Sequence, residues 1–311
     1  MRIFTRERLI ALGLFFVFLF GMTQFSRKMH YAVGMGTCIW SDGIGYYEYL
    51  PALFIRHDVN HIGWGMPLPN GNRFDKYATG VAILETPFFL AADAATVLNH
   101  RERTGFSSYY GYGVLFADLF YTFAGFIFLF YTLRKWFSLR TVFFSIILIA
   151  LGTNLFYYGF AEPSMSHAYS FFAFAGFLFY CRKFHEEGRR SRHLHAVGFF
   201  LGLATAIRPT SIVIGIFFLL YGVYSGKDFR ERLKTFFSDR RIIPALLFWG
   251  VLLFLPQMLY WHSTTGKWFT YSYGYYDEGF TYWKSPHFFD VLFGPWCSWI
   301  PYTPVMIFFF P

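Results

Sequence analysis

Residues 40–58 read WSDGIGYYEYLPALFIRHD and bring carboxylates, tyrosines and a histidine into one short stretch. They follow residues 9–25, an apolar run of the length that spans a bilayer, roughly 17 to 25 residues. Three arginines precede this run, and positively charged flanks stay in the cytoplasm, so the first helix runs outward. No small-residue cleavage site follows it, and we interpret it as an uncleaved helix with a cytoplasmic N-terminus. Residues 26–111 then form a long extracytoplasmic loop.

The composition is that of a membrane protein. Of the 311 residues, 55% are hydrophobic and 14% are charged, and the mean hydropathy is +0.36. Soluble domains carry roughly 25% charged residues. The chain is 25% aromatic, more than two interfacial belts need, so part of this surface is available to line a cavity. Three cysteines, at positions 38, 181 and 297, are too few and too scattered for a disulfide framework or a metal cluster.

Two topologies are possible after the first loop. Residues 80–98 are apolar but contain two acids and a proline, and residues 112–133 form a cleaner span that is followed by a basic cluster at 134–140. If both segments crossed the membrane, the basic cluster would lie outside. A charge at the middle of a membrane-spanning helix costs roughly 2.5–3.5 kcal/mol on insertion scales, and residues 80–98 contain two acids. We therefore predict that this segment lies along the outer membrane surface or forms a re-entrant segment, which places the basic cluster inside.

The sequence thus predicts an all-α polytopic transmembrane helical bundle of about seven or eight spans, with 1–311 as a single transmembrane domain. The further predicted spans are 141–158, 166–181, 194–207, 209–224 and 242–261, then an outer loop at 262–290 and a last span beginning at 291. The abrupt end of the apolar run at 311 suggests a chain that lacks further helices.

The charges agree with this path. The inner segments hold 17 of the 27 Lys and Arg and 6 of the 18 Asp and Glu, a net charge of +11, which leaves −2 outside and accounts for the total of +9. Topology therefore explains the basic balance, and nucleic acid is excluded as a partner. The sequence contains no P-loop, dinucleotide fingerprint, HExxH zinc motif or nucleophile elbow, so nucleotide-driven transport has no support.

Asp42 is the first candidate for chemistry. It stands on a glycine-flanked turn near the outer interface, where a carboxylate accepts a proton from a hydroxyl or holds a divalent cation such as Mg or Mn beside a phosphate. The alternative is an ordinary cap or turn residue, which Asp favours. Glu48, His57 and Asp58 on the same loop offer further substrate or metal contacts, or are solvated loop residues.

Four more positions carry polar groups close to the predicted hydrocarbon. Glu162 and His167 lie in a very short outer turn and are expected to have partners, a substrate or a metal. Arg208 joins two apolar runs, where it either grips a phosphate or extends to lipid headgroups. Asp118 lies inside a span, and we expect a neutral acid that is bonded to a neighbouring helix.

Two cation and tyrosine positions complete the set. Lys76 precedes the 80–98 segment, where a cation meets a lipid phosphate or serves as an interfacial anchor. Tyr273 lies in the run YSYGYYDE at 271–278, which is typical of a sugar-stacking surface and also of an interfacial belt.

The layout resembles the GT-C superfamily of membrane glycosyltransferases, which includes protein O-mannosyltransferases and the aminoarabinose transferases of lipid A. The first helix enters from inside, and the outer loop carries the early acid Asp42. A juxtamembrane apolar segment follows at 80–98, and aromatic outer loops follow later helices. The run GLATAIRPT at 202–210 is similar to the Gly-Leu-Ala…Arg-Pro segment of such enzymes, and 42–53 and 162–167 resemble stretches of large bacterial membrane proteins assigned to this superfamily. A second acid directly beside Asp42 is absent, which leaves metal dependence open, and members tend to be longer.

The resemblance implies a polyprenyl-phosphate sugar donor, a glycan, lipid or protein acceptor, transfer at the outer face of a bacterial inner membrane, and inversion at the anomeric carbon. It implies that Asp42 is the general base, that Arg208 with Lys76 neutralises the leaving phosphate, and that Glu162 and His167 orient the sugar or bind a cation. A flippase for lipid-linked sugars and a non-catalytic assembly subunit are the alternatives. A flippase needs polar residues along a path through the membrane, where Asp118 is the main buried acid.

Overall fold

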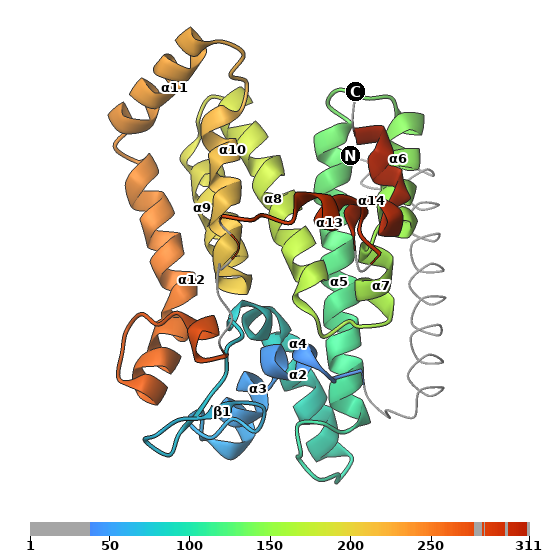
Figure 1. The fold of residues 1–311 in the computed structure, drawn as a ribbon, viewed down its shortest axis with the longest axis vertical. Helices are drawn as coiled ribbons and strands as arrows, with labels where there is room; N and C mark the ends of the chain where they lie inside the picture. The colour runs from blue at the N-terminus through green and yellow to red at the C-terminus, as the bar shows by residue number, and fades with distance from the viewer. Residues whose placement is uncertain (1–37, 277–281, 283, 296–297, 310–311) are drawn as a thin grey trace, which may run out of the picture.

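The computed structural model describes residues 38–276, 282, 284–295 and 298–309, so the helix predicted at 9–25 lies outside the described residues (Figure 1). The described chain is all-α, as predicted, apart from one antiparallel pair of two-residue strands, β1 (Met66–Pro67) and β2 (Arg73–Phe74). This all-α class follows from the apolar composition, because a helix satisfies its backbone hydrogen bonds within the segment.

Four long helices form the bundle: α5 (Ser108–Leu133), α8 (Ser166–Glu186), α9 (Ser191–Ile207) and α12 (Ile242–Thr265). They pack in series, α5 on α8, α8 on α9 and α9 on α12 (Figure 1). The α9–α12 contact is close because α9 presents glycine. A Cβ on Gly202 would lie 2.7 Å from the carbonyl oxygen of Trp249. Close packing of this kind is usual where small residues line a helix interface in a membrane.

Among the described residues, three helices are long and apolar enough to cross a bilayer: α4 (Gly80–Leu98), α5 and α12. Large apolar side chains are exposed along α12, including Leu247 and Val251 at 61% and 57% exposure. Exposed apolar faces of this extent are what a lipid environment covers. These features support the multi-pass membrane class, while several shorter apolar helices fall below the spanning length.

Three of the predicted spans are not single helices. The span at 141–158 divides into α6 (Leu139–Gly152) and α7 (Leu155–Phe160), because the backbone becomes extended at Thr153 (φ −121°, ψ 171°), where α6 ends. The span at 209–224 begins as a 3₁₀ helix, η2 (Pro209–Ile214), before α10 (Gly215–Leu220). Among the described residues of 291–311, Gly294 ends α13 (Phe288–Phe293), and only α14 (Trp299–Tyr302) and the 3₁₀ helix η4 (Pro304–Phe309) follow.

The first loop forms a folded layer at one end of the bundle (Figure 1). It contains α2 (Asp42–Tyr47), α3 (Tyr49–Pro51), the π-helix η1 (Ala52–Arg56), the strand pair and α4. Helix α4 runs antiparallel to α5: the Tyr121 hydroxyl donates to the Leu84 carbonyl, while Gly113 faces Phe88 and Ala92. Its contacts at Tyr121 and Gly113 place it beside the first half of α5, and Glu85 of α4 also accepts a hydrogen bond from Tyr169 of α8.

The opposite end of the bundle holds the basic segments. The turn after α5 is tied to α8 by Lys135 and Glu186, 3.8 Å apart. Helix α11 (Gly226–Ser238) is tied to the same end of α8 by a hydrogen bond between Arg232 and His185. The basic segments and the acid-bearing loop therefore lie at opposite ends of the bundle, which is the arrangement that the predicted topology requires (Figure 1).

Candidate functional site

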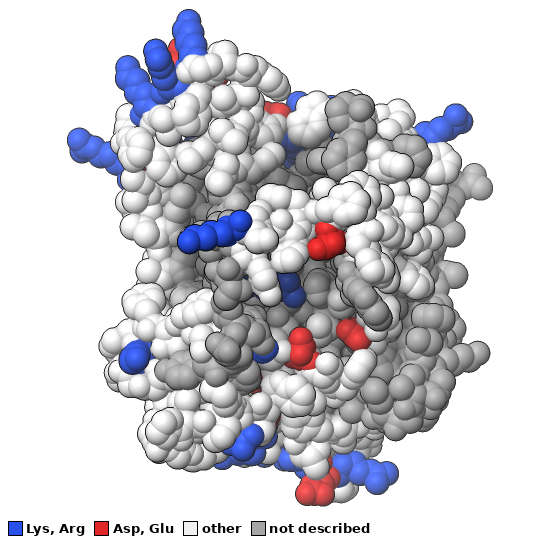
Figure 2. Space-filling view, in the orientation of Figure 1, with Lys and Arg blue, Asp and Glu red and all other residues white. Residues whose placement is uncertain are grey.

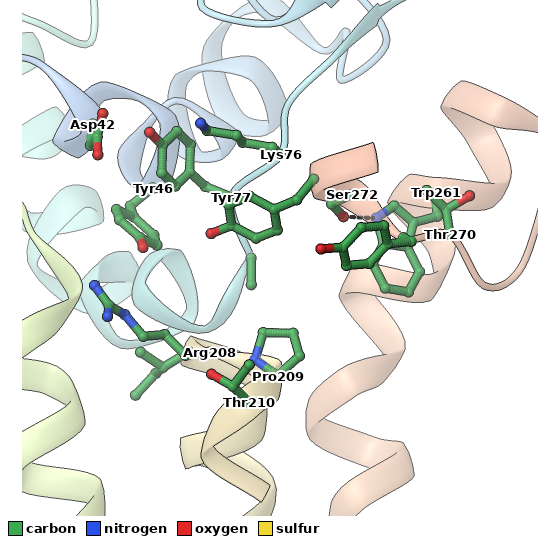
Figure 3. A pocket seen from close by; sticks show the side chains of 14 residues that line it. Asp42, Tyr46, Lys76, Tyr77, Arg208, Pro209, Thr210, Trp261, Thr270 and Ser272 are labelled. Atoms are coloured by element: carbon green, nitrogen blue, oxygen red, sulfur yellow. Dashed lines mark hydrogen bonds between the residues drawn. The ribbon is translucent and has the colours of Figure 1, made fainter. Parts of the chain in front are cut away.

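A cavity of about 500 Å³ lies between the loop layer and the bundle (Figure 3). Its walls come from α2, the segment before α4, the junction of α9 with η2, and the end of α12 with the residues that follow. Four of the predicted site residues line it: Asp42, Lys76, Arg208 and Tyr273. They come from distant parts of the sequence and meet only in the folded chain.

Asp42 opens α2 and is exposed to the cavity. Helix α2 lies close to the start of α8, since a Cβ on Gly43 would fall 1.9 Å from Oγ of Ser164. Burial and the neighbouring Asp42 carboxylate raise the pKa of Tyr77, so its phenol stays protonated. In Figure 3, Asp42 lies on the same side of the cavity as Tyr46 and Arg208. The carboxylate thus faces the cavity and has a protonated phenol as a neighbour.

Arg208 follows the last residue of α9 in an extended conformation, φ −143° and ψ 115°, as expected before a proline. Its Nε donates to Oγ of Ser166 at 2.8 Å, and its Nη2 lies 3.4 Å from Nε2 of His167. The Ser166 hydroxyl in turn donates to the Tyr46 hydroxyl at 3.3 Å. No described carboxylate lies within 4.0 Å of this guanidinium, so its charge is available to an anion from outside the chain.

A second cavity, of about 650 Å³, shares Arg208 and Thr210 with the first. Its lining comes mainly from α6, α8, η2 and the segment from α14 to η4, and about half of its described lining residues are apolar. His167 lines this second cavity and not the first, with its ring stacked on Tyr158 at a centroid distance of 3.6 Å. Arg208 therefore borders both cavities.

Glu48 and Glu162 line neither cavity. Glu48 is 4% exposed, and its carboxylate accepts hydrogen bonds from Arg56 at 3.1 Å and from the backbone N–H groups of Gly63 and Trp64 at 2.7 and 2.8 Å. These bonds hold the turn before β1 against η1. Glu162 accepts a hydrogen bond of 2.9 Å from the hydroxyl of Tyr157. Both carboxylates are therefore hydrogen-bonded to neighbouring groups of the protein outside the two cavities.

The candidate metal ligands do not assemble. Across the described ranges, no group of three or more His, Cys, Asp or Glu side chains is placed to hold a metal ion. Asp42 lines the first cavity, His167 the second, and Glu162 neither. The first cavity therefore offers one described carboxylate, Asp42, together with the cations Lys76 and Arg208.

Asp118 does not have the hydrogen bond to a neighbouring helix that the sequence predicted. It is fully buried, and neither carboxyl oxygen has a hydrogen-bond partner among the described residues, so the predicted bond to a neighbouring helix is not found there. Glu85 on α4 is also buried and accepts a hydrogen bond of 2.7 Å from Tyr169. Buried acids of this kind are costly unless they are neutral. The sequence indicated Asp118 but did not single out Glu85 for a function.

Aromatic residues of the cavity were missed. Tyr46, Tyr77 and Trp261 line it, and the Trp261 indole donates to Oγ of Ser272 at 3.1 Å (Figure 3). The Lys76 ammonium lies 5.5 Å from the ring centroid of Tyr77 and 5.5 Å from that of Tyr273. In a chain that is one quarter aromatic, no local signal distinguishes the rings that face a cavity from those that face lipid.

The first cavity thus combines an exposed carboxylate, a guanidinium with no described acidic partner, and aromatic walls. Aromatic faces suit sugar rings, and a guanidinium suits a phosphate. Comparisons of the chain with protein-family models, with curated proteins and with solved structures find no match.

Proposed function

We propose that this protein is an integral-membrane glycosyltransferase that moves a sugar from a polyprenyl-phosphate donor to an acceptor on the extracytoplasmic face, with Asp42 as the general base. The observation that carries the proposal is the meeting of Asp42 and Arg208 in one cavity at the loop end of the bundle. Transfer of a glycosyl group needs both a base for the acceptor and a cation for the departing phosphate.

Asp42 takes the proton of the acceptor hydroxyl as its oxygen attacks the anomeric carbon. The carboxylate is exposed to the cavity, so a hydroxyl from solution or from the membrane surface can reach it. The protonated phenol of Tyr77 is its neighbour in the cavity. Because attack comes from the face opposite the phosphate, the reaction inverts the configuration at that carbon.

Arg208 stabilises the phosphate that leaves. The bonds from its side chain to Ser166 and His167 hold the guanidinium in place before the donor binds, so little ordering is needed during the reaction. Lys76 lines the same cavity and adds positive charge.

The second cavity offers space for the lipid part of a lipid-linked donor. It begins at Arg208, and its lining includes the apolar side chains of Ile149, Phe171 and Ile214, from α6, α8 and η2. An isoprenoid chain can occupy it while the phosphate lies at Arg208 and the sugar in the first cavity. The tyrosines and Trp261 of the first cavity then contact the sugar.

Asp42→Asn tests the proposal. Purified protein in nanodiscs is incubated with radiolabelled polyprenyl-phosphate hexoses and a bacterial envelope extract as acceptor, and label transfer and release of polyprenyl phosphate are measured. Loss of a general base predicts a decrease of roughly 10²- to 10⁴-fold. Asp58→Asn is the matched control, since Asp58 is on the same loop and lines neither cavity, and it should retain activity.

The same variant separates the alternatives. Unchanged transfer by Asp42→Asn would remove the catalytic assignment. Movement of labelled donor across vesicle membranes by both the wild type and Asp42→Asn, without transfer, would instead identify a flippase.

A further inference from the structure

We infer that α11 is an interfacial helix that binds anionic lipid headgroups at the membrane face opposite the cavity. This inference does not depend on the proposed function. Helix α11 reads GKDFRERLKTFFS and is the most polar of the long helices. In Figure 2, Lys and Arg side chains gather at the upper left, where α11 lies in Figure 1.

Its inward face is anchored. Arg232 donates to the carbonyl of Tyr221 at 2.7 Å and is hydrogen-bonded to His185 on α8. Phe236 packs against Phe218 of α10, with a centroid distance of 6.4 Å. These contacts fix the rotation of α11 about its axis, and they therefore decide which side chains face outward.

The outward face carries the cations. Lys227, Arg230 and Lys234 recur at intervals of three and four residues, the spacing of one helix face, and all three are exposed. Glu231 on this face is also exposed, so the four side chains sum to a net charge of +2. Asp228 stays ionised and accepts a hydrogen bond from the backbone N–H of Tyr224, and with Arg232 included the whole helix also carries a net charge of +2.

Aromatic side chains are exposed beside the cations. Tyr224 is 93% exposed and Phe237 is 68% exposed. Phe237 stands shortly before α12, whose side chains Ile243 and Leu247 are exposed and apolar, so the aromatic edge of α11 continues toward the apolar face of a spanning helix. A basic face flanked by aromatic residues suits the headgroup region, where lipid phosphates and apolar chains meet.

This continuity favours a lipid surface over a soluble partner. A soluble polyanion would pair with Lys227, Arg230 and Lys234 but would leave Tyr224 and Phe237 in water. Anionic phospholipids satisfy both the cations and the rings. Each Lys or Arg near an anionic surface is worth about 1 kcal/mol, which corresponds to about a fivefold change in an equilibrium constant.

The test places a nitroxide label at Phe237→Cys in the full chain with Cys297→Ser; the remaining cysteines, Cys38 and Cys181, are buried. The chain is reconstituted in nanodiscs of phosphatidylcholine with increasing phosphatidylglycerol. Collisional accessibility to oxygen and to a nickel chelate reports the depth of the label. We expect immersion to increase with phosphatidylglycerol, and the half-maximal fraction to rise along the series Lys227→Gln, Arg230→Gln, Lys234→Gln. At a fixed phosphatidylglycerol fraction, the equilibrium constant for immersion should fall about fivefold for each cation removed.

Two matched variants sharpen the result. Glu231→Gln should lower the half-maximal fraction, and an Arg/Lys exchange at positions 227, 230 and 234 should leave it unchanged, since the charge is conserved. Thermal unfolding shows whether the neutral variants stay folded. Equal immersion in pure phosphatidylcholine, or in the triple neutral variant, would overturn the inference. A label that stays aqueous at every phosphatidylglycerol fraction would overturn it too and would leave the basic face to a soluble polyanion.

Discussion

Arg208→Gln should reduce glycosyl transfer far more than it reduces stability. The side chain holds Ser166 and His167 in the folded protein but has no described carboxylate partner, so its charge is not needed to balance a buried acid. Its replacement should lower stability by about 1 kcal/mol, the net contribution of an ordinary hydrogen bond. The larger effect should appear when the phosphate departs.

The size of that effect follows from the surroundings of the guanidinium. Two unit charges 4 Å apart interact by about 4 kcal/mol at an effective dielectric constant of about 20. A charge-assisted hydrogen bond contributes about 1.5–3 kcal/mol. Because Arg208 is only partly buried and the cavity is open to water, we take about 2–3 kcal/mol, or roughly a 30- to 150-fold decrease in kcat/KM.

The assay follows release of polyprenyl phosphate in nanodiscs, with thermal unfolding measured on the same samples. Arg208→Lys keeps the positive charge but loses the planar set of donors that binds a phosphate through two hydrogen bonds, and it loses the bond from Nε to Ser166. Its kcat/KM should fall roughly tenfold. Ser166→Ala removes the acceptor that positions Nε and should lose roughly fivefold. If folded Arg208→Gln retained a kcat/KM within threefold of the wild type, the phosphate assignment would be refuted.

Three further substitutions test the scaffold. Gly80→Ala should lower stability by more than about 2 kcal/mol in a thermal-unfolding assay, because the new Cβ would lie 2.3 Å from the backbone carbonyl carbon of Ala206. Gly226→Ala is the control: no described packing neighbour lies within 4 Å of its new Cβ, and its stability should not change. Glu48→Gln should cost about 2–3 kcal/mol through its lost charge-assisted bonds without altering KM, and a changed KM would instead support substrate contact. Burial raises the pKa of Asp75 above its unfolded value, so stability falls as the pH rises above about 4; Asp75→Asn should therefore raise the unfolding midpoint more at pH 8 than at pH 4.

The candidate site was predictable in part. Asp42 and Arg208 each stand out locally, one on a glycine-flanked turn after an apolar run and the other between two apolar runs. Glu48 looked equally suited to chemistry, but its carboxylate is engaged by the loop that folds over it. Glu162 and His167 are close in sequence, yet only His167 lines a cavity. The difference depends on which segments pack against each residue, and a single stretch of sequence does not contain that information.

The helix boundaries show the same division. Apolar composition continues through 141–158 and 209–224, but α6 ends at Thr153, where the backbone is extended, and Pro209 begins a 3₁₀ helix. Hydropathy averages over a window, whereas a helix ends through individual hydrogen bonds. The predicted spans were therefore too long in these regions.

The amino-acid sequence alone determined that this chain is helical and apolar, and that its basic residues gather in particular segments. Hydropathy and charge are summed along one segment, so they can be recognised without knowing its neighbours. Only the tertiary structure decided that Asp42, Tyr77 and Arg208 face one cavity and that Arg208 also borders a second. That arrangement depends on contacts between distant segments, such as the close approach of Gly80 to Ala206, and it exists only when the helices are packed together.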